Sequence, residues 1–218
     1  MSALDLAAFR ATPLTREPFE YLVVPHFVRP EARQAIHADY PRIDRPGSFP
    51  TRGLMYGPAF AALVHELQGP EMRAAFEEKF GIDLRGRPTM ITVRGRCGPK
   101  DGRIHTDAVT KLITVLIYLN PPWEDPGGRL RLLRSADNLD DVILEVPPEE
   151  GLLLAFRRRD NSYHGHKPFV GERRVIQLNW VTSRWVLHRE LFRHHLSAWV
   201  KRILPARPAP RSPARRAA

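Results

Sequence analysis

From residue 88 to about residue 181 the chain is a succession of short β-prone runs, and this pattern constrains the fold more than any other feature. The runs are rich in β-branched residues or alternate between apolar and polar residues; they read PTMITVRGRC, GRIHTD, KLITVLIYLN, GRLRLLRS, DVILEV, GLLLAFRR and RRVIQLNWV. Turn residues such as Gly98-Pro99, Pro121-Pro122 and Gly127-Gly128 separate them. Regularly spaced short strands of this kind predict an antiparallel sandwich or barrel.

The first 87 residues predict mainly helices. Residues 18–27 have the pattern of a first strand, and residues 29–41 that of a helix with proline near its start, where the missing N–H costs little. Residues 59–69 and 70–80 predict two amphipathic helices, the second ended by Gly81. The chain is therefore expected to belong to the α+β class, with supporting helices before the β-rich core.

The end of the chain has a different composition. Residues 186–204 predict a C-terminal helix with apolar residues on one face and basic residues on much of the other. Residues 205–218, which read PARPAPRSPARRAA, are low in complexity and predict a disordered tail. The expected organisation is one domain over residues 1–204, with a β core at about 88–182, followed by that tail.

Composition excludes several classes of protein. A chain of 218 residues can bury a full core. Its longest apolar runs are too short to span a bilayer, and its N-terminus lacks the pattern of a secretory signal. Cys97 is the only cysteine, which excludes an internal disulfide and cysteine-rich zinc sites and predicts a cytoplasmic location.

The formal charge is +10, but the tail contributes four arginines and no acid, so the rest of the chain carries 10 − 4 = +6. A moderately basic surface attracts nucleic acid, anionic lipid or acidic metabolites without choosing among them. The basic C-terminus would permit weak contact with nucleic acid or an anionic membrane. A solvated surface without a specific partner is an equally good interpretation.

His105-Thr106-Asp107 is a candidate metal-binding motif. On a strand, residues i and i+2 point to the same face, so His105 and Asp107 would present an imidazole and a carboxylate side by side. A third ligand is available at His164 or His166, in the segment YHGHKP. Two histidines and one carboxylate leave metal positions open and suit non-heme Fe(II) oxygen chemistry.

Four segments in this order resemble the 2-oxoglutarate- and Fe(II)-dependent dioxygenases, and more narrowly their prolyl 4-hydroxylase-like branch. The segments are HTD, KLITVLIYLN with Lys111, Thr114 and Tyr118, WEDPGGRLRLL followed by GLLLAF, and YHGHKPFVGERRVIQLNW. The resemblance covers roughly residues 18–181. It implies a double-stranded β-helix, or jelly-roll, and a metal set of His105, Asp107 and His164.

The resemblance also implies a site for 2-oxoglutarate, whose far carboxylate would pair with an arginine and with the hydroxyl of Tyr118. The family's arginine lies six residues before a tryptophan, which selects Arg174 with Trp180. Arg174 would then share an inward, mostly apolar face with Ile176 and Leu178. Counting forward from His164 favours Arg173 instead, if the intervening turn is one residue shorter.

The histidine choice rests on a similar spacing. In the family, the ligand histidine precedes a proline with three residues between them, as His164 precedes Pro168, while His166 does not fit. His166 would then be a supporting or substrate-facing group. The sequence leaves both alternatives open, His164 or His166 as the third metal ligand and Arg174 or Arg173 as the partner of 2-oxoglutarate.

The resemblance implies an enzyme that uses Fe(II), 2-oxoglutarate and O2, with ascorbate as a reductant, releases succinate and CO2, and hydroxylates a peptidyl, small-molecule or lipid-linked substrate. Basic segments expected near the entrance (residues 42–56, 98–103 and 157–162) favour an acidic substrate. Two alternatives are a non-catalytic metal- or ligand-binding jelly-roll and an oxidative demethylase of nucleic acids. The demethylase branch has a second arginine where this chain has Trp180, which argues against it.

Overall fold

The structure is a computed structural model that describes residues 2–189. Four helices occupy the N-terminal part: α1 (Leu6–Ala11), α2 (Pro30–Ala38), α3 (Pro58–Leu67) and α4 (Pro70–Phe80). The structure also describes nine strands: β1 (Tyr21–Val24), β2 (Phe49–Pro50), β3 (Thr89–Cys97), β4 (Lys111–Tyr118), β5 (Leu130–Leu133), β6 (Val142–Val146), β7 (Leu153–Arg157), β8 (Tyr163–Gly165) and β9 (Gly171–Val181).

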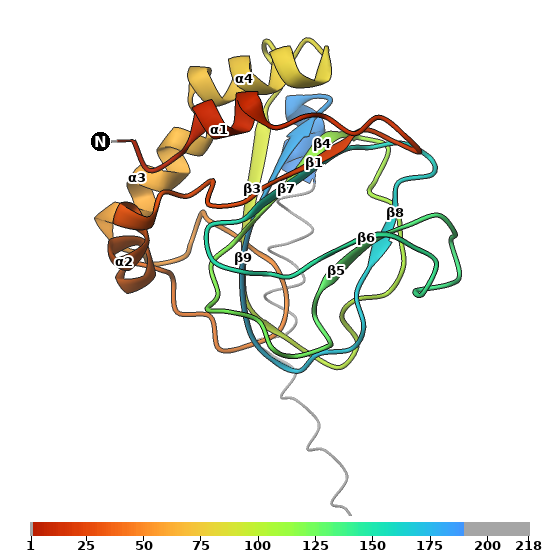
Figure 1. Ribbon diagram of the computed structural model, residues 1–218. Coiled ribbons are helices and arrows are strands. Elements are labelled where there is room, and N and C mark those ends of the chain that lie inside the picture. Colours follow the sequence, from red (N-terminus) through yellow and green to blue (C-terminus); the bar gives the residue numbers. More distant parts are fainter. Residues whose placement is uncertain (1, 190–218) are drawn as a thin grey trace, which may run out of the picture.

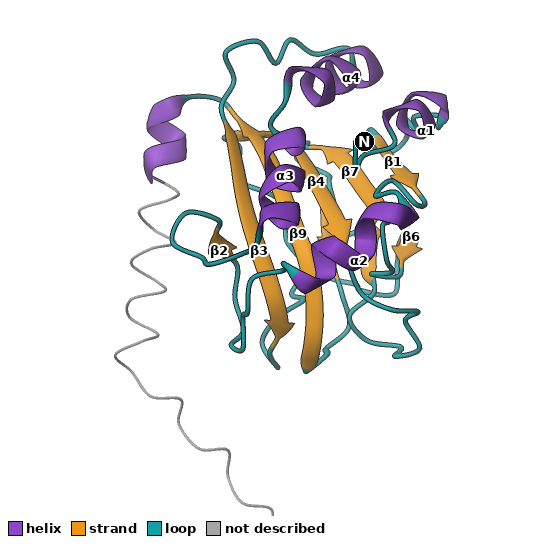
Figure 2. Cartoon of the chain, turned by 90° about the vertical axis from the view of Figure 1, so that its left-hand side faces the viewer, coloured by secondary structure: helices purple, strands orange, loops and turns teal. Residues whose placement is uncertain are grey.

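The strands form two antiparallel sheets. The larger has six strands in the order β1-β7-β4-β9-β3-β2, and the smaller has three in the order β6-β5-β8. The helices lie against one face of the six-stranded sheet, and the small sheet lies on its opposite side (Figures 1 and 2). This is the α+β double-stranded β-helix that the sequence predicts, and the prediction is confirmed.

The two central strands of the large sheet are buried on both faces. In β4, Val115 and Ile117 belong to the hydrophobic cluster under the helices, whereas Leu116 and Tyr118 belong to the cluster between the sheets. In β9, Ile176, Leu178 and Trp180 lie under the helices, whereas Val175 faces the small sheet. Because side chains alternate along a strand, one side of each strand can pack the helices while the other builds the interior of the sandwich.

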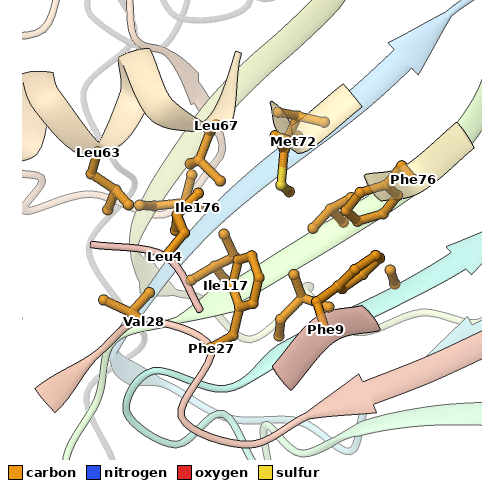
Figure 3. Close-up of a cluster of buried hydrophobic side chains, with 14 of the residues drawn as sticks. Leu4, Phe9, Phe27, Val28, Leu63, Leu67, Met72, Phe76, Ile117 and Ile176 are labelled. Atoms are coloured by element: carbon orange, nitrogen blue, oxygen red, sulfur yellow. The ribbon is translucent and has the colours of Figure 1, made fainter. Parts of the chain in front are cut away.

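The core under the helices is rich in aromatic residues. Phe76 of α4 is fully buried, with its ring centroid 4.4 Å from that of Phe9 in α1 and 4.8 Å from that of Trp180 in β9. Figure 3 shows Phe9 and Phe76 in the same cluster as Met72, Ile117 and Ile176, where helices and sheet meet. Burial of this surface holds the helical layer to the back of the large sheet.

The predicted helices begin where proline stands at the first helical position: Pro30, Pro58 and Pro70. Gly81 ends α4 with a φ of 59°, a left-handed conformation that glycine adopts readily. The short helix α1 was not predicted. Of the predicted C-terminal helix, residues 186–189 are helical; its remainder and the tail lie outside the described residues.

We predict that Phe76→Ala lowers the free energy of unfolding by about 3–5 kcal/mol, because it removes a buried ring at the junction of α1, α4 and β9. Urea denaturation followed by circular dichroism measures this difference. Met55→Ala is the control, since Met55 is 92% exposed and its loss should change stability by no more than about 0.5 kcal/mol. A change below about 1 kcal/mol for Phe76→Ala would contradict this description of the core.

Candidate metal and co-substrate site

His105, Asp107 and His164 come together at one end of the space between the sheets. His105 forms an isolated antiparallel bridge with His164: each backbone N–H donates to the other residue's carbonyl, at 3.0 and 2.9 Å. The two imidazole centroids are consequently 4.3 Å apart. One potential ligand atom from each of the three side chains lies within 4.8 Å of the other two. The structure thus brings together the three residues that the sequence selects.

Both imidazoles are held by backbone carbonyls. His105 Nδ1 lies 2.9 Å from the Arg103 carbonyl oxygen, and His164 Nδ1 lies 3.0 Å from that of Ser162. A carbonyl oxygen only accepts, so each Nδ1 carries a proton, and in the neutral ring each Nε2 then has the lone pair that a metal would use. Burial lowers the pKa of His164 to about 4, which keeps this ring in the neutral form that a metal requires.

The carboxylate of Asp107 is 6% exposed and is held on both oxygens. Lys111 Nζ donates to Oδ1 at 2.5 Å, and the Thr114 hydroxyl donates to Oδ2. Asn179 Nδ2 in turn donates to Thr114 Oγ1 at 2.8 Å, which orients the hydroxyl. Burial alone would raise the pKa of Asp107, but the Lys111 ammonium and the other nearby groups lower it to about 2. The Asp107 side chain is therefore a fixed, charged carboxylate.

A cavity of about 260 Å³ extends from these three residues between the sheets. Its walls combine apolar side chains, among them Leu116, Leu130 and Val175, with polar ones from β3 and β9. His105 is exposed, whereas Asp107 and His164 are buried, so the cluster of potential ligands lies where the cavity meets solvent. The cavity can hold a small molecule next to a metal and shield most of it from water.

Arg173 and Tyr118 lie next to each other in the interior between the sheets and could bind an anion there. Arg173 is 5% exposed and lines the cavity; its Nε donates to the Gly128 carbonyl at 2.8 Å. Its guanidinium carbon lies 5.3 Å from the centroid of the Tyr118 ring. The Tyr118 hydroxyl is fully buried, with no hydrogen-bond partner among the described residues. A buried cation beside an unsatisfied hydroxyl is an arrangement that a bound carboxylate would complete.

Arg174 does not face the cavity, and the prediction that it does is wrong. Its side chain lies on the helix side of β9, where Nε donates to Glu172 at 2.6 Å and the guanidinium carbon lies 5.3 Å from the Tyr40 ring centroid. The apolar face that Arg174 shares with Ile176 and Leu178 packs against the helices. The other face of β9, with Arg173 and Gln177, lines the cavity.

His166 also lines the cavity but does not belong to the three-residue cluster. It is 7% exposed, and its Nδ1 lies 2.8 Å from the Lys167 carbonyl. Burial lowers its pKa to about 4. This position agrees with a supporting or substrate-facing group and leaves His164 as the histidine beside His105 and Asp107.

Asn179, Gln177 and Arg94 were not selected from the sequence as site residues, although Gln177 and Arg94 line the cavity and Asn179 holds Thr114. A signal was present in β9, since Arg173, Gln177 and Asn179 are polar residues on one face of the strand, whose other face carries the apolar Ile176, Leu178 and Trp180. Arg94 pairs with Asp101 at 2.8 Å and so ties the loop before His105 to β3. No local pattern indicates that pair.

Residues 95–182 match the family model of the 2OG-Fe(II) oxygenase superfamily. A prolyl-4-hydroxylase from Pseudomonas putida has a TM-score of 0.52 and 19% identity, over 74% of this chain and 91% of that one. An oxidoreductase of the 2OG-Fe(II) oxygenase family from Burkholderia pseudomallei has a TM-score of 0.52 and 15% identity, over 83% of this chain and 95% of that one. No curated protein sequence matches the chain.

At these identities the solved structures show the fold alone, and the family match is confined to residues 95–182. The matched segment contains His105, Asp107 and His164, together with Tyr118 and Arg173. The match supports the resemblance to the 2OG-Fe(II) oxygenase superfamily over this segment, and the prolyl-4-hydroxylase from Pseudomonas putida shares the fold. Residues 95–182 thus match the 2OG-Fe(II) oxygenase superfamily, and the three potential metal ligands within them gather at the mouth of a cavity in a double-stranded β-helix.

Proposed function

We propose that His105, Asp107 and His164 bind Fe(II) and that Arg173 and Tyr118 bind the far carboxylate of 2-oxoglutarate. The observation that carries the proposal is that all five side chains border or adjoin one cavity between the two sheets. Two imidazoles and a carboxylate are a donor set suited to Fe(II). When bound, Fe(II), O2 and 2-oxoglutarate supply the oxidising chemistry that yields succinate, CO2 and a hydroxylated substrate.

The chain's own residues position and shield these groups. Thr114 and Lys111 fix the Asp107 carboxylate, while the Arg103 and Ser162 carbonyls fix the two imidazoles. Arg173 offers a planar fork of donors at the far end of the cavity, and burial strengthens its attraction for a carboxylate. The exposed edge at His105 is the side from which we expect the substrate to approach.

The class of the substrate has to be inferred from the charge of the segments expected near the entrance of the cavity. The predicted basic rim is partly neutralised, since Arg157 and Arg159 both pair with Glu20, and Arg158 pairs with Asp160. An acidic substrate therefore stays a prediction, as does the use of ascorbate. Contact with nucleic acid or membrane would depend on the basic C-terminus, which lies largely outside the described residues.

Within residues 2–189, no helix has the length and apolar character needed to cross a membrane. We also propose a cytoplasmic location, because the single cysteine, Cys97, is buried and unpaired. The division into a domain over residues 1–204 and a tail over 205–218 likewise remains a proposal.

We predict that His105→Ala and Asp107→Ala abolish Fe(II)-dependent conversion of 2-oxoglutarate to succinate and weaken Mn(II) binding by at least about 100-fold, since each removes one of three metal ligands. Succinate is measured by chromatography and Mn(II) by electron paramagnetic resonance of the free ion. His65→Ala, on the exposed side of α3, is the matched control and should behave as the wild type. Wild-type Mn(II) affinity in either ligand variant would contradict the proposed metal set.

Arg173→Ala should raise the KM for 2-oxoglutarate by at least about 30-fold, because a buried carboxylate would lose its charged partner. Arg174→Ala is the matched control on the opposite face of the same strand, and its KM should change less than about threefold. Steady-state succinate formation at saturating Fe(II) measures both. The reverse ranking would show that the co-substrate is held on the other face of β9.

Tyr118→Phe should raise the same KM by about threefold to tenfold, the effect expected for one hydrogen bond. The ring, and with it the packing under Arg173, is kept. Because the hydroxyl has no partner among the described residues, the substitution should leave the unfolding midpoint unchanged or slightly higher. A large loss of stability with an unchanged KM would instead give the hydroxyl a structural role.

A further inference from the structure

Lys111 is a partly buried cation that helps to fix the Asp107 carboxylate, but the proposed metal and co-substrate roles give its charge no part. It stands at the start of β4, its side chain is 16% exposed, and it lines the same cavity as the proposed ligands. Its ammonium lies 2.5 Å from Asp107 Oδ1, on a carboxylate whose side chain is 5% exposed. A lysine in such surroundings contributes a unit positive charge at the place where a divalent metal would bind.

The contact of Lys111 with Asp107 differs in kind from that of Thr114. Thr114 holds Oδ2 through a neutral hydroxyl, which Asn179 orients in turn. Thr114 thus fixes the carboxylate without altering the charge of the site. Lys111 adds a second constraint on the direction of the carboxylate, but it also repels any divalent cation that shares this carboxylate.

Charge also links the metal to the co-substrate. Among the described titratable side chains that line the cavity, Lys111, Arg94 and Arg173 are cations, and Asp107 is the one acid. Arg94 has its own acid, Asp101, at 2.8 Å, so its charge is largely balanced. The two positive charges of Lys111 and Arg173 exceed the single negative charge of Asp107. This excess of positive charge disfavours the binding of a metal cation in the cavity and favours the binding of an anion.

We propose, building on the metal and co-substrate site above, that Lys111 is a positioning residue that weakens metal binding in the absence of 2-oxoglutarate and makes it depend on the co-substrate. The dianion would offset the repulsion between the ammonium and the metal, so that each ligand favours the binding of the other. Such coupling is reciprocal by thermodynamic necessity. It would keep the site from holding a metal tightly before the co-substrate is present.

The test is a set of Mn(II) titrations under anaerobic conditions, with and without 2-oxoglutarate, on the wild type, Lys111→Met and Lys111→Arg. Charges a few ångströms apart change binding constants by about tenfold or more even when screened as in water. Lys111→Met should therefore bind Mn(II) about tenfold more tightly alone, and its gain in affinity on adding 2-oxoglutarate should be about tenfold smaller. Lys111→Arg keeps the charge and should resemble the wild type.

Thr114→Val separates charge from orientation, because it removes a hydrogen bond to Asp107 and no charge. It should bind Mn(II) with equal or lower affinity, never higher. Equal or weaker Mn(II) binding by Lys111→Met, or Lys111→Arg behaving like Lys111→Met, would overturn the proposal for Lys111 while leaving the metal set intact. A wild type that binds no Mn(II) would overturn both.

Discussion

The burial of both faces of the six-stranded sheet is the constraint on which the rest of the structure depends. Helices α1 to α4 cover one face with an aromatic core, so that face needs no other partner. The opposite face is then free to carry polar groups toward the small sheet. Asn179, Gln177 and Arg173 can lie in the interior of the sandwich because Trp180, Leu178 and Ile176, on the alternate positions, hold the same strand to the helices.

This two-sided burial also explains what the sequence could and could not predict. The succession of short strands and the proline-initiated helices were enough to predict the fold class, the HxD motif drew attention to His105 and Asp107, and the family resemblance favoured His164 over His166. The choice between Arg173 and Arg174 failed, because the more apolar face of β9 was assumed to point inward. In a sheet covered on both sides, the apolar face belongs to the helices and the polar alternation marks the site. Contacts between distant segments, such as Arg94 with Asp101 and Lys111 with Asp107, depend on loop paths that no local pattern encodes.

The site has the electrostatic balance that an iron and 2-oxoglutarate enzyme needs. Two imidazoles oriented by backbone carbonyls, one of them (His164) kept neutral by burial, stand beside a carboxylate held charged by Lys111 and Thr114. Farther in, Arg173 and the Tyr118 hydroxyl provide the complement to a carboxylate. Each of these groups is placed by a hydrogen bond or a packing contact within the chain, so the site is largely preorganised for its ligands.

In the proposed metal site His164, and not His166, stands with His105 and Asp107. The most direct measurement is Fe(II)-dependent succinate formation, with bound metal determined in parallel, for His164→Ala and His166→Ala. The account predicts that His164→Ala loses both bound metal and succinate formation, whereas His166→Ala keeps its metal and at least part of its succinate formation. Loss of metal in His166→Ala with retention in His164→Ala would contradict it.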